Sequence, residues 1–258
     1  MLPLSRKLSI ILCSLLGLIA AARAEDPLQK RSEEIFPLPL DGALTVEHSD
    51  GSIHIYGWYE PRVRLVAVRK AYTALRLEQI RVETKSEPSA LMVRTVIPPV
   101  SGLFADRSGT IEYTLTVPEP ARLKLRMASG EISLQGLRGA KVDLAMENGR
   151  LLVINSYAEI RARARNGVLE ALFEWWEKLP TKFDYAMERG RIAVRLPSAA
   201  QFRIEARTDQ GRVHDEFHFP PPTNLGVGQT LTAATAPDPP VSLGLRTGSG
   251  NVSLEAIR

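Results

Sequence analysis

Cysteine, histidine and aromatic side chains are scarce in this sequence. The only cysteine among 258 residues is Cys13, which lies in an apolar N-terminal run, and there are four histidines. Without further cysteines the rest of the chain can form neither a disulfide nor a thiolate metal site, so its stability must come from its core. Aromatic residues make up only 6% of the chain, which leaves few side chains for stacking on a sugar.

The sequence motifs of common catalytic and phosphate-binding sites are also missing. No serine lies in a nucleophile elbow, and no glycine-rich loop with a lysine opens a helix. The spacing of His214 and His218 would suit a metal on a helix, but on a strand they lie roughly 13 Å apart and cannot share one ion. The adjacent acids Asp215 and Glu216 point to opposite faces of a strand. We therefore expect no catalytic residue, no cofactor and no bound metal, and predict that the chain is not an enzyme.

The N-terminus carries the features of a secretory signal peptide. Arg6 and Lys7 precede an apolar run from Leu8 to Ala22, and the sequence Ala-Arg-Ala ends at Ala24. The run is shorter than the roughly 20 residues of a membrane-spanning helix, although a retained anchor is the alternative. We predict cleavage after Ala24, export to the periplasm or the cell surface, and no integral membrane segment in the mature chain.

The formal net charge of +4 becomes smaller when the signal peptide is removed. Arg6, Lys7 and Arg23 leave with it, so the 33 basic residues of the whole chain become 30, against 29 acidic residues. A net charge of +1 gives little counterion release on a phosphate backbone, so we expect no nucleic-acid partner. The charged residues that alternate with apolar ones are interpreted as a solvated face.

A turn tripeptide that ends in glycine occurs seven times, with apolar residues at fixed distances on both sides. Glycine supplies the positive φ that a tight corner requires. The seven corner glycines are Gly51, Gly130, Gly149, Gly167, Gly190, Gly211 and Gly250. Apolar residues follow every glycine at the second position, and they also precede it at the seventh and fifth positions. This alternation predicts two half-buried strands that meet at each corner.

The glycine spacing indicates the fold class. Successive corners from Gly130 to Gly211 lie 19, 18, 23 and 21 residues apart, a period that is typical of a β-solenoid. We predict an all-β, right-handed parallel β-helix-like solenoid with an N-terminal antiparallel β cap; a β-sandwich is the alternative. The predicted organisation is a signal peptide at 1–24 and one exported domain at 25–258. Within it, 25–120 form the cap, with a short helix near 71–79, and 121–258 form the repeat coils.

Two segments depart from the repeat. Apolar residues at helical spacing predict a short amphipathic helix at 168–179, although the repeat frame favours a strand there. The segment 220–240 is rich in proline and is expected to be a long exposed loop before the last coil. His48 occupies a corner position that is methionine in three other repeats, so we expect it to pack inside.

The corner motifs resemble a known family. The segments Gly190–Pro197, Phe202–Gly211 and Thr247–Val252, together with the exported N-terminus, are similar to the bacterial putative-adhesin domain family, related to the heads of autotransporter-like adhesins. The resemblance covers roughly residues 40–258. It implies a β-helix-like domain of the cell envelope with a proposed role in adhesion, and it brings no catalytic residues.

The best candidates for partner contact are Trp175 and Trp176. On the expected helix, Trp176 would join the apolar face while Trp175 projects outward as an anchor for a protein or a sugar. The alternative is that both tryptophans have only a packing role and fill space in an irregular coil. We predict an adhesin-like, non-catalytic module whose partner is an envelope protein or polysaccharide. The alternative is a polysaccharide lyase or hydrolase on a β-helix scaffold.

Overall fold

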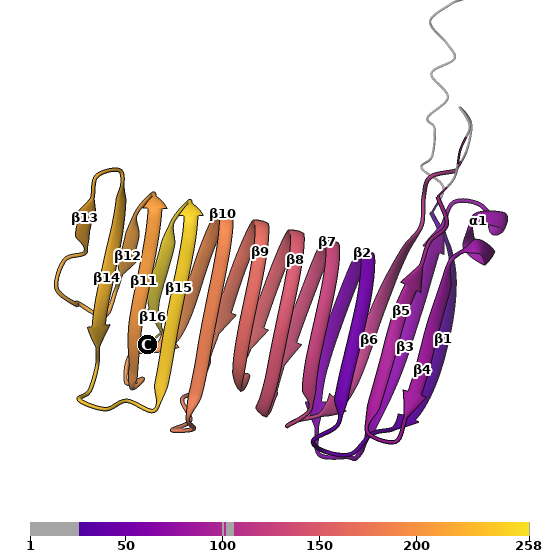
Figure 1. The fold of residues 1–258 in the computed structure, drawn as a ribbon, viewed down its shortest axis with the longest axis horizontal. Coiled ribbons are helices and arrows are strands. Elements are labelled where there is room, and N and C mark those ends of the chain that lie inside the picture. The colour runs from indigo at the N-terminus through magenta and orange to yellow at the C-terminus, as the bar shows by residue number, and fades with distance from the viewer. Residues whose placement is uncertain (1–25, 100, 102–105, 258) are drawn as a thin grey trace, which may run out of the picture.

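The structure, a computed structural model, describes residues 26–99, 101 and 106–257. The predicted signal peptide at 1–24 lies outside these residues. The described chain folds into sixteen strands and one six-residue helix, so the predicted all-β class is confirmed. All sixteen strands join one mixed sheet, which is parallel in its middle and antiparallel at both ends (Figure 1).

Long parallel strands stacked in register form the middle of the molecule. In sequence order they are β2 (Ala43–Trp58), β7 (Arg122–Gln135), β8 (Arg138–Ile154), β9 (Tyr157–Leu172) and β10 (Thr181–Pro197). Each pairs with the next so that corner glycine lies beside corner glycine, from Gly51 through Gly190. The apolar residues on both sides of each glycine belong to one buried cluster, which explains the alternation in the sequence.

The corner glycines are fixed by the close approach of neighbouring strands. Gly167 has φ of +144°, and a Cβ atom placed on it would lie 1.8 Å from the carbonyl oxygen of Gly149. The other six corner glycines show the same conflict with the backbone of an adjacent strand. Only glycine can occupy these positions, because any side chain would collide with backbone atoms that cannot move aside.

The C-terminal strands are inserted into the stack. β15 (Val241–Ser249) lies between β10 and β11 (Phe202–Gln210) and is parallel to both. On the other side of the corner, β16 (Val252–Ile257) likewise lies between β10 and β12 (Val213–Asp215). The order of coils in the stack therefore differs from their order in the sequence, and Figure 1 shows the yellow β15 beside the orange β10.

The N-terminal end of the stack is built from short strands. β5 (Ala90–Val96) and β6 (Thr110–Pro118) pair in parallel with the first and second halves of β2. β3 (Arg62–Ala71) pairs antiparallel with β6, and β1 (Leu28–Pro37) pairs antiparallel with β3. β4 (Arg81–Glu87) pairs antiparallel with β5, and the helix α1 (Ala74–Gln79) connects β3 to β4.

Two local predictions are wrong. The predicted helix at 168–179 is absent: β9 continues to Leu172, and 173–180 are irregular. The segment 220–240 is not one open loop, since it contains the hairpin of β13 (Thr223–Leu225) and β14 (Gly228–Ala234), which pairs with β11. In both places hydrogen bonds to strands distant in sequence outweigh the local pattern.

Candidate functional site

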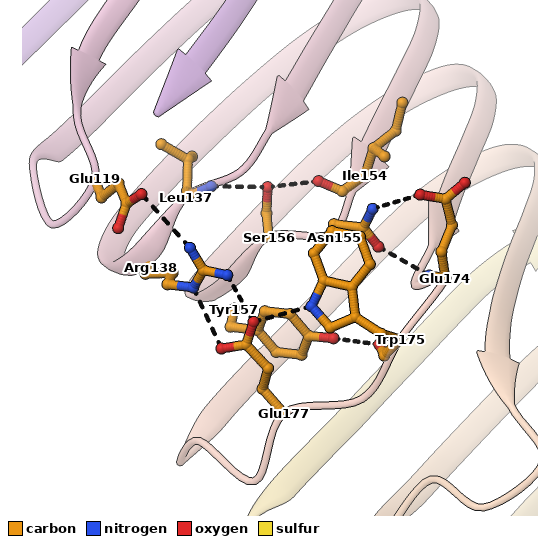
Figure 2. A network of polar contacts seen from close by, with 10 residues as sticks. All are labelled: Glu119, Leu137, Arg138, Ile154, Asn155, Ser156, Tyr157, Glu174, Trp175 and Glu177. Carbon is orange, nitrogen blue, oxygen red and sulfur yellow. Dashed lines mark hydrogen bonds and ion pairs between the residues drawn. The ribbon is translucent and has the colours of Figure 1, made fainter. Parts of the chain in front are cut away.

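The segment that follows β9 presents Trp175 at the surface. Its side chain is 47% exposed, and its indole N–H donates a 2.9 Å hydrogen bond to Glu177 Oε1. Figure 2 shows the ring beside Glu177, above the ribbon of the stacked strands. This bond fixes the orientation of a large, half-exposed aromatic side chain.

Glu177 is held in turn by Arg138, the first residue of β8. Arg138 donates from Nη2 to Oε1 at 2.7 Å and from Nε to Oε2 at 3.2 Å, and its Nη1 lies 3.6 Å from Glu119 Oε1. The hydrogen bonds from Arg138 and Trp175 lower the pKa of Glu177 below its ordinary value. Glu177 is therefore a carboxylate in two-pronged contact with a guanidinium, the geometry that gives ion pairs their specificity.

Two further residues fix the backbone beneath Trp175. The Asn155 side chain accepts from Glu174 N and donates to Glu174 Oε2, both at 2.8 Å, and the Tyr157 hydroxyl donates to the Trp175 carbonyl oxygen. Asn155 is buried with a φ of +44°, a conformation that asparagine tolerates better than most residues. The irregular segment is thus tied at three successive points, so Trp175 is preorganised rather than free to move.

Trp176 lies on the inner side of the same segment. Its ring packs edge-on against Tyr157, Phe173 and Phe202, with ring centroids 6.1 to 6.5 Å apart. Its buried indole nitrogen has no hydrogen-bond partner among the described residues. The structure therefore separates the two tryptophans: Trp175 is at the surface, and Trp176 is partly buried and packs against the core.

The four histidines differ in their burial, contacts and position in the fold. His48 is buried, with its ring nitrogens 2.7 Å from Thr95 Oγ1 and 3.0 Å from the Ile111 carbonyl oxygen, so its predicted packing position is confirmed. His54 points outward and contacts Ser133 Oγ at 2.8 Å. His214 lies on β12, whereas His218 lies beyond it with a φ of +58°.

Asp215 has a local structural role. Its carboxylate accepts hydrogen bonds from the backbone N–H groups of Phe217 and Phe219 at 2.9 and 2.8 Å. These bonds close the turn after β12 and compensate for a carboxylate at a position that is apolar in the other coils. Within the described part of the chain, no three histidine, cysteine or acidic side chains gather in a metal-binding arrangement.

A hollow of about 620 Å³ lies on the outer side of β10, β15 and β11. Gly244 is one of its lining residues and is paired with Asp184 on one side and with Glu205 on the other. Burial raises the pKa of Asp184, but the hydrogen bond from Arg163 and the nearby arginine charges outweigh burial, so the net pKa is lowered. Asp184 is therefore an anion in a basic surrounding, with Arg163 Nη2 at 2.8 Å and Arg246 Nη1 at 4.0 Å.

None of the helices in the described ranges has the length and hydropathy needed to cross a membrane. No protein-family model matches the chain, and no curated protein matches it either.

Several solved structures share a distant likeness. A "putative cell adhesion protein" from Clostridium sporogenes is 14% identical, covers 88% of this chain and 100% of its own, and has a TM-score of 0.47. A "putative adhesin" from Bacteroides fragilis is 10% identical, covers 87% of this chain and 97% of its own, and has a TM-score of 0.32. A "putative lipid binding protein" from Parabacteroides distasonis is 9% identical, with coverages of 87% and 96% and a TM-score of 0.23. At TM-scores below 0.5 these likenesses carry no argument about function.

Proposed function

We propose that residues 25–258 form one exported, non-catalytic binding module of the bacterial cell envelope, adhesin-like in role, after a signal peptide at 1–24. We further propose that its stacked strands form a β-solenoid, which the parallel register of glycine on glycine from β2 to β10 supports. Such a scaffold is rigid and displays surface side chains in fixed positions. The proposed partner is an envelope protein or polysaccharide.

The observation that carries the binding role is the fixed Trp175. A half-exposed tryptophan whose ring, backbone carbonyl and neighbouring glutamates are all tied by hydrogen bonds loses little entropy when it contacts a partner. Tryptophan is also the residue most often found at energetic centres of interfaces, and its ring stacks well on the apolar face of a sugar.

Replacement of Trp175 tests this site. The purified chain 25–258 is offered envelope polysaccharides and cell-surface fractions, and the Trp175→Ala variant is expected to bind the recognised partner at least about tenfold more weakly, or ~1.4 kcal/mol. Isothermal titration calorimetry measures the affinity, and thermal unfolding checks that both proteins are folded.

Tyr72→Ala is the matched control, because Tyr72 is 60% exposed and lies between β3 and α1, at the end of β3 that is opposite to the turn beside Glu119. Equal weakening by the two substitutions contradicts a specific role of Trp175. Each polysaccharide is also checked for cleavage, and any cleavage by the unmodified chain contradicts the non-catalytic assignment.

A further inference from the structure

Charge is unevenly distributed between the two outer faces of the stack. The first-half face consists of the outward side chains that precede the corner glycines on β2, β7, β8, β9, β10, β15 and β11, and its charge is concentrated at the eighth, sixth and fourth positions before each glycine. Its basic residues are Arg122, Lys124, Arg126, Lys141, Arg161, Arg163, Lys182, Arg203, Arg207 and Arg246. Its acidic residues are Glu47, Asp143, Glu159, Asp184 and Glu205. Ten basic against five acidic residues give these positions a formal charge of +5. The outward residues two positions before the glycines add Arg165, Glu147, Glu188 and Asp209, so the whole face has a formal charge of +3.

The other outer face is balanced. The outward side chains that follow the corner glycines on these coils include four basic and four acidic residues. They are Arg150, Arg191, Arg195, Arg212, Glu131, Glu170, Glu216 and Glu255. A nearly neutral mature chain therefore has a positive potential concentrated on one flat side, and such a concentration attracts polyanions.

Internal ion pairs neutralise only part of this charge. Arginines on alternate strands pair with an acid on the next strand, and the N–O distances are 2.9 Å for Arg126–Asp143 and 2.8 Å for Arg163–Asp184. Within the part of the chain that the structure describes, the side chains of Lys124, Lys141 and Lys182 form no ion pair and donate no hydrogen bond. These three ammonium groups are available to a ligand.

Two hollows on the first-half face have basic rims. One, of about 440 Å³, lies beside Ala43 and Thr45 on β2. Its border has four basic residues and two acidic ones: Arg122, Lys124, Lys141, Arg161, Asp143 and Glu159. The second is the hollow of about 620 Å³ around Gly244, which Lys182, Arg203 and Arg246 border. Four strand spacings, or ~19 Å, separate β7 beside the first from β15 in the second. Both hollows therefore lie within reach of one extended polymer.

Gly244 is not required by the backbone. A Cβ atom at this position would meet its nearest neighbour, the Phe183 carbonyl oxygen, at 3.6 Å, which is ordinary contact, and Gly244 does not have the positive φ of the corner glycines. Glycine weakens a strand interior unless something else approaches the backbone closely. The backbone does not require glycine at this position. A glycine there leaves room for a ligand to approach the backbone of the hollow closely.

The mixture of charges on this face limits the class of ligand. Guanidinium and ammonium groups bind carboxylates, whereas Asp184 Oδ1, which accepts no hydrogen bond from the described residues, can accept one from a ligand hydroxyl. A nucleic acid would find no aromatic stacking platform among the outward residues of this face, and its phosphates would face Asp184 and Glu205. We infer that the first-half face binds an acidic polysaccharide, whose carboxylates contact Lys124, Lys141 and Lys182 and whose hydroxyls contact the acids around Gly244. This inference rests on the proposed binding function and names its ligand class.

Polygalacturonate is the probe that tests the inference, with dextran as the neutral polymer and single-stranded DNA as the other polyanion. The chain 25–258 is expected to bind polygalacturonate and not dextran, and to bind it at least fivefold more weakly at about 200 mM salt than at about 50 mM. A stronger affinity for single-stranded DNA than for polygalacturonate overturns the ligand class.

The triple variant Lys124→Gln, Lys141→Gln, Lys182→Gln locates the binding face, and at least a tenfold loss of affinity is expected. Its charge-matched control is Lys30→Gln, Arg107→Gln, Arg212→Gln, in which the three replaced residues are exposed but lie off the first-half face. Equal loss in the two triple variants overturns the assignment to this face. All these substitutions are at exposed positions, so both proteins are expected to unfold at the temperature of the parent chain.

Gly244→Val probes the hollow itself. Valine suits a strand and has room at this position, so thermal stability is expected to be unchanged or higher, while polygalacturonate binding falls at least tenfold. Retained binding in a stable Gly244→Val protein overturns the role of the hollow. Binding that depends on the lysines but not on Trp175 contradicts only the Trp175 site, whereas failure to bind every glycan and cell fraction contradicts the proposed function as a whole.

Discussion

Gly167→Ala is expected to lower the free energy of unfolding by about 3 kcal/mol or more, or to prevent folding altogether. The new Cβ would lie 1.8 Å from the Gly149 carbonyl oxygen, and the φ of +144° is one that alanine rarely adopts. Relief of this conflict requires the strands to separate, which breaks the parallel ladder on both sides. Urea denaturation of the chain 25–258, followed by far-ultraviolet circular dichroism, measures the loss.

Gly136→Ala is the control for this prediction. Gly136 also has a positive φ, +68°, but a Cβ atom there would meet nothing within 4 Å. Only the left-handed backbone penalty applies, so the expected loss is about 1 kcal/mol. If Gly136→Ala folds and Gly167→Ala does not, the expectation holds; equal losses in the two variants show that close strand approach is not what requires glycine.

Acidification is expected to destabilise the N-terminal end of the stack through His48. Burial lowers the pKa of His48 to about 4, against the opposing effect of its hydrogen bond with the Ile111 carbonyl oxygen. Because the pKa of the folded state lies below the unfolded value of about 6.5, the unfolded chain takes up the proton first as the pH falls. The contribution is complete above pH ~6.5 and is lost as the pH falls towards 4, by about 3 kcal/mol.

His48→Met isolates this contribution. Met127 lies directly beside His48 in the stack, and methionine occupies the same corner position on β8 and β10, so the side chain suits the site. Urea denaturation at pH 7 and pH 4 is expected to show a smaller acid-induced loss in the variant, by about 3 kcal/mol. Equal pH dependence of the two proteins would mean that His48 is not held neutral by burial.

The sequence predicted the corner positions and the inward residues because both depend on constraints within a few residues. A glycine that needs a positive φ and apolar residues at period two are visible in any single coil. The same local view failed at 168–179, where Leu169 and Ala171 lie on a strand paired to β8 and β10. Partners outside the window determine that structure, and a helical spacing alone cannot reveal them.

The sites show the same limit. The sequence singled out Trp175, but nothing near it identifies Arg138, which lies 39 residues from its partner Glu177 and orients the carboxylate that holds the ring. The basic face was missed for another reason: a net charge of +1 sums over both faces and hides an excess on one of them. The excess of basic residues becomes visible in the sequence when the charges before and after each corner glycine are counted separately.

The insertion of β15 has a consequence for the order of assembly. β10 and β11 are neighbours in the chain, yet they do not pair with each other, because β15, which is synthesised later, lies between them and is parallel to both. While it is missing, β10 exposes an unpaired edge, and β11 can pair there in the register that β15 will need, since Phe183 and Ile204 share Leu243 as partner. A chain shortened to end at residue 240 is therefore expected to aggregate during refolding. The last coils of this stack can therefore reach their final order only after residues 241–257 have been synthesised.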